Sequence, residues 1–154
     1  MDFRIKGLDP QPFAPFFAMD AGELASHRAI RKVADRSPGF PCRVTLSDAD
    51  PGRAVLLMNY EHLPVDSPYR ASHAIYVSDA QVPFDEVNTI PPAFASRLLA
   101  VRAFDATGLM IDADIVEGRE CTPLIRRLLA LPQTAYLHAH YAKRGCYAGR
   151  IERA

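Results

Sequence analysis

The stretch TAYLHAHYAKRGCYAGRIER, residues 134–153, decides how the second half of the chain folds. It has two runs of alternating character joined by Lys143-Arg144-Gly145, and a three-residue loop that ends in glycine is typical of a β-hairpin. The first run carries His138 and His140, whose side chains point to the same face of a strand because that face recurs every second residue. The stretch therefore predicts a hairpin with two histidines on one face.

A second hairpin and a helix are predicted just before it. Residues 97–118, RLLAVRAFDATGLMIDADIVEG, give two strands around Ala106-Thr107-Gly108, again a three-residue loop that ends in glycine. Residues 121–133, CTPLIRRLLALPQ, gather leucine and isoleucine on one helical face, with Arg126 and Arg127 facing away and Pro132 ending the helix. The second half is therefore expected to run β-β-α-β-β.

The two loops also predict which side chains share a face. Counting outward from them places Arg102 opposite Asp112, Ala100 opposite Asp114, Arg150 opposite His138, Ala148 opposite His140, and Cys146 opposite Ala142. If both hairpins join one sheet over the helix, the other face of that sheet collects Arg102, Asp112, Asp114, His138, His140, Cys146 and Arg150. Antiparallel sheets commonly leave one face in water, so this face is either solvated or covered by the first half of the chain.

The first half predicts shorter elements. Residues 1–8 read as an opening strand with one wet face, and Asp20 with Glu23 forms the capping box of a short helix within residues 19–30. Residues 42–62 predict a hairpin that turns at Asp50-Pro51-Gly52, and its second strand is apolar on both faces and so central in a sheet. We expect one α+β domain, residues 1–154, of mainly antiparallel sheet with a few short helices.

The histidine pair is a weak candidate metal site. Two imidazoles roughly 7 Å apart on one strand can converge on an ion. A third ligand would have to come from Asp112, Asp114, His62, His73 or Cys146, none of which the sequence singles out. No cofactor is predicted. His138 and His140 could equally be polar groups on a solvated sheet face.

Two other groups of residues are candidates for chemistry. Cys146 or Cys42 could act as a nucleophile with a histidine base, although free cysteines are often simply buried. The connection LPVDSPYRAS, residues 63–72, holds Tyr69 and Arg70 and is followed by His73. Together with Arg102, Asp112 and Arg150, these are candidate ligand-binding residues, weighed against an ordinary surface turn.

Composition excludes some partners. The 18 basic and 18 acidic residues cancel and are scattered, so neither nucleic acid nor a membrane surface is an expected partner. Three cysteines without paired spacing predict free thiols. No export signal or membrane-length apolar run is present, so we expect a cytoplasmic protein.

Four stretches carry a family resemblance: SPGFPCR (37–43), LPVDSPYRASHAIYV (63–77), LLAVRAFDATGLMIDADIVEG (98–118) and KRGCYAGRIER (143–153). Together they resemble an uncharacterised bacterial family, the domain of unknown function numbered 1203. The resemblance implies a small bacterial stand-alone protein and assigns no activity, substrate or cofactor. From the residues we expect a protein or small enzyme that binds a small anionic or polar molecule. The alternative is a non-catalytic interaction protein, as a homodimer through an exposed sheet face or edge.

Overall fold

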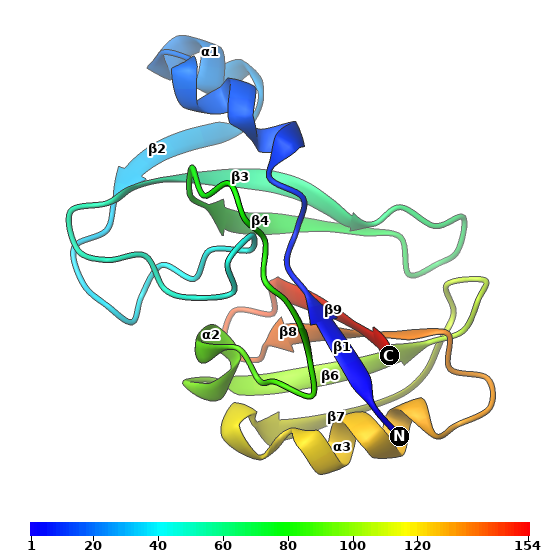
Figure 1. Ribbon diagram of the computed structural model, residues 1–154. Coiled ribbons are helices and arrows are strands. Elements are labelled where there is room, and N and C mark those ends of the chain that lie inside the picture. The colour runs from blue at the N-terminus through cyan, green and yellow to red at the C-terminus, as the bar shows by residue number, and fades with distance from the viewer.

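The computed structural model describes residues 1–154 and contains two antiparallel sheets, one above the other (Figure 1). The larger sheet has the order β5-β1-β9-β8-β6-β7 and the smaller one the order β2-β3-β4. The strands of the larger sheet are β1 (Phe3–Lys6), β5 (Asp85–Val87), β6 (Leu98–Phe104), β7 (Met110–Glu117), β8 (Tyr136–Tyr141) and β9 (Tyr147–Arg153). Those of the smaller sheet are β2 (Ala29–Val33), β3 (Ala54–Leu63) and β4 (Ala71–Val77).

The helices are short and lie outside the two sheets. They are α1 (Ala21–Ser26), α2 (Pro92–Ala95), α3 (Thr122–Leu129) and two 3-10 helices, Gln11–Ala18 and Gly118–Glu120. Helix α3 covers the face of the larger sheet that is turned away from the smaller sheet (Figure 1). The predicted α+β class and the β-β-α-β-β order of the second half, β6-β7-α3-β8-β9, are confirmed.

The largest core lies between α3 and the larger sheet. Ile125, Leu128 and Leu129 are fully buried against apolar side chains of β6, β8 and β9, as the helical pattern predicts. Arg126 and Arg127 are both exposed, but Arg127 reaches β7, where it pairs with Asp112 and Asp114, so the prediction that it faces away from the sheet is wrong. This packing fixes which face of β8 points at the helix, and therefore leaves the histidine face of β8 turned toward the smaller sheet.

In the first half of the chain, the predicted first strand and helix cap are present, but the predicted hairpin is not. Strand β1 and the Asp20–Glu23 capping box are present, and β3 is the central strand of its sheet, as predicted. The predicted hairpin across residues 42–62 is wrong, because residues 42–44 form only isolated bridges and turns, and β3 pairs instead with β2 and β4. Gly52 still has the positive φ of +87° that the turn requires. The sequence did not predict strand β2, because the strand begins within residues 19–30, where a helix is predicted.

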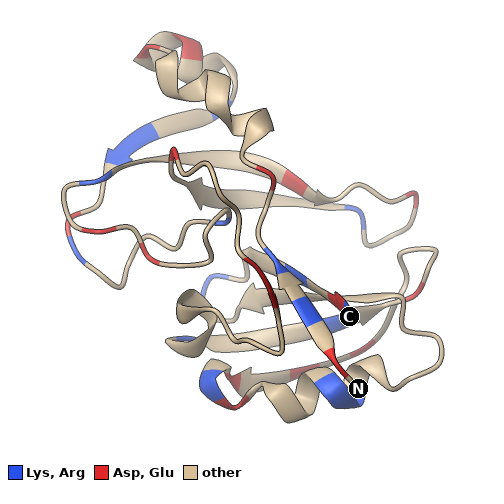
Figure 2. Cartoon of the chain, in the orientation of Figure 1, with Lys and Arg blue, Asp and Glu red and all other residues tan.

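Charge and hydropathy agree with the composition. Basic and acidic side chains alternate over both sheets without a continuous stripe of either sign (Figure 2). None of the helices has the length and apolar character needed to cross a membrane. All three cysteines are free, as the unpaired spacing predicts.

Candidate metal centre

Strand β8 carries His138 and His140 on the face that meets the smaller sheet. Both rings are buried, each with only 2% of its surface exposed. The strand has Leu137, Ala139 and Tyr141 in the core under α3, so alternation along the strand turns both histidines the other way. The interpretation that the first half of the chain covers this polar face is therefore confirmed, and a bare, solvated face is excluded.

A third histidine arrives from the smaller sheet. His62, near the end of β3, has its ring centroid 5.2 Å from that of His140 and 5.9 Å from that of His138. One ring nitrogen from each of the three residues lies within 4.8 Å of the others. One strand of each sheet, β8 and β3, thus brings the three imidazoles together.

The three rings have unsatisfied nitrogens. Four buried side-chain polar atoms of the chain have no hydrogen-bond partner, and three of them are His62 Nδ1, His138 Nδ1 and His140 Nε2. The fourth is Tyr141 Oη. Burying a polar atom without a partner costs about 1–3 kcal/mol, so such atoms are rare unless they have a use.

The tautomer of His140 follows from its other nitrogen. Its Nδ1 lies 2.9 Å from the Gly145 carbonyl oxygen, which can only accept, so Nδ1 carries the proton and donates. The unpartnered Nε2 of His140 therefore presents a lone pair. A backbone carbonyl that orients a histidine in this way is a common feature of metal-binding histidines.

All three rings are neutral at pH 7. Burial lowers the pKa of His62 to about 4, with further lowering from the charges of Arg102 and His73. Burial, followed by the neighbouring histidines and arginines, lowers the pKa of His138 to about 2. Burial also dominates for His140, where it outweighs the hydrogen bond to Gly145 and lowers the pKa to about 3. Neutral imidazole is the form that binds a metal.

Aromatic rings enclose the three histidines. Tyr147 is stacked on His62, with centroids 5.2 Å apart and planes 8° apart, and meets His138 edge-on at 5.0 Å. Phe104 and Tyr136 contact His138 from the other side, at 5.3 and 5.2 Å. This wall restricts water and holds the rings in place, which strengthens any electrostatic contact made there.

Arg102 and Arg150 share the face of His138, as predicted, and the structure places them on either side of it. Arg102 on β6 and Arg150 on β9 are both directly opposite His138 in the register. The guanidinium of Arg150 already has partners: it donates to Glu152 and lies 3.9 Å from the Tyr136 ring centroid. Arg102 makes no ion pair and no side-chain hydrogen bond, and burial lowers its pKa. The histidine face therefore has one free guanidinium.

The predicted pairing of Arg102 with Asp112 is wrong. A register shift between Ala103 and Phe104 places Arg102 opposite Ala113, and moves Asp112 and Asp114 to the α3 side. There Arg127 of α3 pairs with both carboxylates, at 3.0 and 3.1 Å. The loop itself has the predicted length, because Phe104 pairs with Met110 and the Asp105 N–H donates to the Leu109 carbonyl at 2.9 Å; the extra residue is a bulge at Ile111 of β7.

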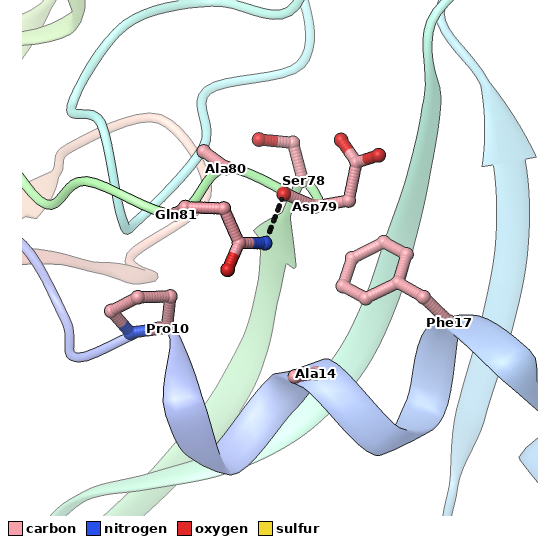
Figure 3. Close-up of a pocket in the computed structure, with 7 residues that line it drawn as sticks. All are labelled: Pro10, Ala14, Phe17, Ser78, Asp79, Ala80 and Gln81. Carbon is pink, nitrogen blue, oxygen red and sulfur yellow. Dashed lines mark hydrogen bonds between the residues drawn. The ribbon is translucent and has the colours of Figure 1, made fainter.

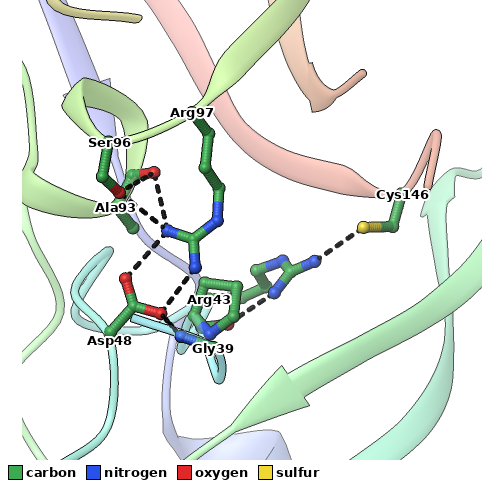
Figure 4. Close-up of polar contacts among 8 residues, drawn as sticks. Gly39, Arg43, Asp48, Ala93, Ser96, Arg97 and Cys146 are labelled. Atoms are coloured by element: carbon green, nitrogen blue, oxygen red, sulfur yellow. Dashed lines mark hydrogen bonds and ion pairs between the residues drawn. The ribbon is translucent and has the colours of Figure 1, made fainter. Parts of the chain in front are cut away.

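A second bulge changes the C-terminal hairpin. The register shifts between Ala139 and His140, so that His140 faces Tyr147 instead of Ala148. Cys146 consequently leaves the histidine face and joins the α3-side core, so its predicted place beside His140 is wrong. Its Sγ accepts from the buried guanidinium of Arg43 at 3.2 Å, close to the Arg97–Asp48 ion pair (Figure 4).

The remaining candidates do not join the three histidines. Cys42 is buried in the core of the smaller sheet and accepts hydrogen bonds from Ser78. Arg70 pairs with Glu61 at the surface, and Tyr69 meets Phe104 edge-on at 6.3 Å, one ring away from His138. His73 on β4 is half-buried and close enough to His62 and His140 for its charge to lower their pKa.

Two surface hollows lie away from the histidines. One, of about 90 Å³, lies between the first 3-10 helix and the end of β4 and is lined by Pro10, Ala14, Phe17, Ser78, Asp79, Ala80 and Gln81 (Figure 3). Its one carboxylate, Asp79, already pairs with Arg53. The other, of about 480 Å³, is lined by Lys6 and Asp85, which pair with Glu152 and Arg4. Asp9 also lines this second hollow; it has no ion pair and accepts from the Gln11 backbone N–H. Neither hollow contains a histidine, a cysteine or an unpaired cation.

The three histidines fit a transition-metal ion. Zn²⁺ binds imidazole nitrogen at about 2.0–2.1 Å, which places tetrahedral ligands roughly 3.4 Å apart, so the rings need to close by no more than roughly 1.4 Å. Three protein ligands leave a fourth position open, which is the arrangement of catalytic rather than structural zinc sites. The sequence missed Tyr147 and could not select His62, since only the meeting of the two sheets brings His62 to β8.

The comparisons with known proteins give a family. Residues 39–153 match the family model described as protein of unknown function (DUF1203). The chain belongs to this family. The match includes β3, β8 and β9 and therefore all three histidines. Comparisons with curated proteins and with solved structures give no match.

Proposed function

We propose that this DUF1203 protein binds one divalent transition-metal ion through His62, His138 and His140, and uses the open metal position to bind a small polar molecule. The proposal is carried by one ring nitrogen from each of three histidines lying within 4.8 Å of the others, in rings that each have a buried nitrogen without a hydrogen-bond partner. Imidazole suits zinc, copper, nickel and cobalt, whereas an all-nitrogen site disfavours magnesium and calcium.

The open position gives the site a chemical use beyond metal storage. A metal held by three neutral imidazoles keeps its full positive charge, and such an ion can lower the pKa of a bound water to about 7 or polarise a carbonyl group. The half-buried His73 and the free Arg102 lie around the site and carry polar groups toward it. These features support binding, or chemistry, of a small polar molecule.

The interaction-protein alternative has weaker support. Ile30 and Val33 are exposed on β2, an edge strand, and could meet a second copy of the chain. That interface would leave the three buried nitrogens without any role, and their cost to stability unexplained. We therefore keep the metal-binding proposal.

The test is a metal titration of untagged, chelator-treated protein. We expect Zn²⁺ and Co²⁺ to bind at one ion per chain, as measured by calorimetry. His62→Gln, His138→Gln and His140→Gln should each weaken binding by at least roughly tenfold, since each removes one of three ligands. His27→Gln is the matched control, because His27 is exposed on the end of α1 and contacts only Phe16 among the aromatic rings.

Two results would contradict the proposal. Wild-type protein that binds neither ion would remove the site altogether. Binding that the three variants retain, or that His27→Gln also weakens, would place the ion elsewhere. Circular dichroism of each variant separates the loss of a ligand from the loss of the fold.

A further inference from the structure

The inner face of the larger sheet holds a cation that nothing in the chain neutralises. Arg102 projects from β6 on the same face as His138, its direct neighbour in the register, and makes no ion pair or side-chain hydrogen bond. All ten ion pairs of the chain involve other residues. A half-buried guanidinium without an anion is a costly arrangement, because burial removes water that would otherwise solvate the charge.

Toward β7, the neighbours of Arg102 on its face of the sheet are small or exposed side chains. Its neighbour on β7 is Ala113, and the adjacent inward position of β6 is Ala100, which lies opposite His140. Beyond Ala100 on the same face comes Ile115 of β7, which is 61% exposed. The side chains between Arg102 and the edge of the sheet are therefore small or open to solvent.

We infer that Arg102 binds the anionic group of the small molecule that occupies the open metal position, and that the ligand class is a small oxyanion, a carboxylate or a phosphate. The inference rests on the proposed metal site. One oxygen of the anion binds the metal ion and another accepts from the guanidinium, whose planar set of N–H donors fits two oxygens at once.

Arg150 shows why the site has one such cation and not two. It lies opposite His138 at the corresponding position on β9, but Glu152 accepts from its Nε and the Tyr136 ring lies against its guanidinium. A positive charge that is already neutralised adds little to anion binding. Arg150 is therefore a control for Arg102: it too lies opposite His138, but on β9, and its guanidinium already has an anionic partner.

The experiment uses Co²⁺-loaded protein, whose visible absorption reports the ligands of the ion, titrated with acetate, inorganic phosphate and the neutral acetamide. We expect acetate and phosphate to change the spectrum of the wild type in a saturable way, and acetamide to do so much more weakly. Arg102→Met should weaken both anions roughly tenfold or more, since a charge-assisted hydrogen bond is lost. Arg102→Lys should lie between the two, and Arg150→Met should behave as the wild type.

The possible results distinguish the role of Arg102 from the proposed metal site. Failure of the wild type to bind Co²⁺ overturns both. Normal Co²⁺ binding with anion affinities that Arg102→Met leaves unchanged, or with acetamide binding as well as acetate, overturns the role of Arg102 and leaves the metal site standing. Arg102→Met should itself bind Co²⁺ at least as well as the wild type, because it removes a like charge near the ion; weaker binding would show that Arg102 is structural instead.

Discussion

At the scale of single residues, the three histidines lower the stability of the metal-free protein. Each keeps a ring nitrogen away from water without a partner, and the fold holds each ring neutral. Hydrophobic side chains of similar volume would pack in the same space without this cost. Residues that are retained at the expense of stability are usually functional, and a metal ion would satisfy all three nitrogens together.

Arg43 is a buried cation of a different kind, since its partners are backbone atoms and a thiol. It donates to Cys146 Sγ (Figure 4), to the Tyr147 carbonyl at 2.7 Å and to the Pro41 carbonyl. It also lies 4.8 Å from the Tyr141 ring centroid. These contacts hold the segment after Gly39 against β9, at Tyr147, which stacks on His62. Its role is to position the strand that walls the site.

We predict that Arg43→Lys lowers the free energy of unfolding by about 2–4 kcal/mol, because one ammonium cannot replace donors that point in three directions. Urea denaturation measures the change. Arg36→Lys is the control, since Arg36 is exposed, its one ion pair is with the exposed Asp35, and a lysine can keep its position 5.7 Å from the Phe40 ring centroid; it should stay within about 0.5 kcal/mol of the wild type. Equal stability of the Arg43 and Arg36 variants would show that the buried contacts are not what fixes β9.

At the scale of elements, alternation along strands predicted part of the site. The facing positions of Arg102, His138 and Arg150 follow from it and are confirmed. The positions of Asp112 and Cys146 do not, because each hairpin contains a bulge that shifts its register by one residue. A bulge inserts one extra residue within a strand, as Ile111 does in β7, and counting outward from the loop does not indicate it.

The turn of the C-terminal hairpin orients His140. Gly145 has a φ of +75°, and its carbonyl accepts from His140 Nδ1. A Cβ at this position would meet no atom within 4 Å, so a substitution acts through backbone strain alone. The turn therefore couples backbone conformation to the direction of the Nε2 lone pair.

We predict that Gly145→Ala lowers the free energy of unfolding by about 1 kcal/mol and weakens metal binding, whereas Gly145→Asn does less of both because asparagine tolerates positive φ. Gly52→Ala is the matched control: Gly52 also has positive φ and open space around it, but it lies in a turn away from the histidines. It should lose similar stability with unchanged metal affinity. Equal loss of affinity in both variants would attribute the effect to general destabilisation.

At the scale of the whole molecule, the site exists only because the smaller sheet folds over the larger one. His62 on β3 and His138 on β8 are 76 positions apart in numbering, and no local pattern connects them. The sequence predicted the antiparallel α+β class, α3 with its buried face, and a covered histidine face as one of two alternatives. It could not select the third histidine, because that depends on how the two sheets meet.

Burial of the neutral histidines predicts acid sensitivity of the metal-free protein. The unfolded chain binds protons at these rings below pH 6.5, while the folded chain, with pKa values of about 4, 2 and 3, does not. The unfolded state therefore binds more protons, and the free energy of unfolding falls as the pH drops from 6.5 toward 4. Asp48 adds a separate loss of stability at lower pH. Burial alone would raise its pKa, but the hydrogen bonds and the charge of Arg97, with the backbone N–H groups of Gly39 and Phe40, outweigh burial and lower the pKa overall.

Urea denaturation of metal-free protein at pH 7.5 and pH 5.5 measures this dependence. We predict a clear loss of stability at pH 5.5 for the wild type and a smaller loss for His138→Gln, which cannot be protonated. His27→Gln should lose as much as the wild type, since His27 is exposed. A pH dependence that His138→Gln leaves unchanged would show that the buried rings do not govern it.

The most direct test of the metal centre is X-ray absorption spectroscopy at the zinc edge on protein loaded with one Zn²⁺ per chain. We predict that the Zn²⁺ ion has three imidazole nitrogens at about 2.0–2.1 Å and one further light-atom ligand, and that it has two imidazole ligands in His62→Gln. A sulfur ligand at about 2.3 Å, or an imidazole count that is the same in the wild type and in His62→Gln, would contradict it.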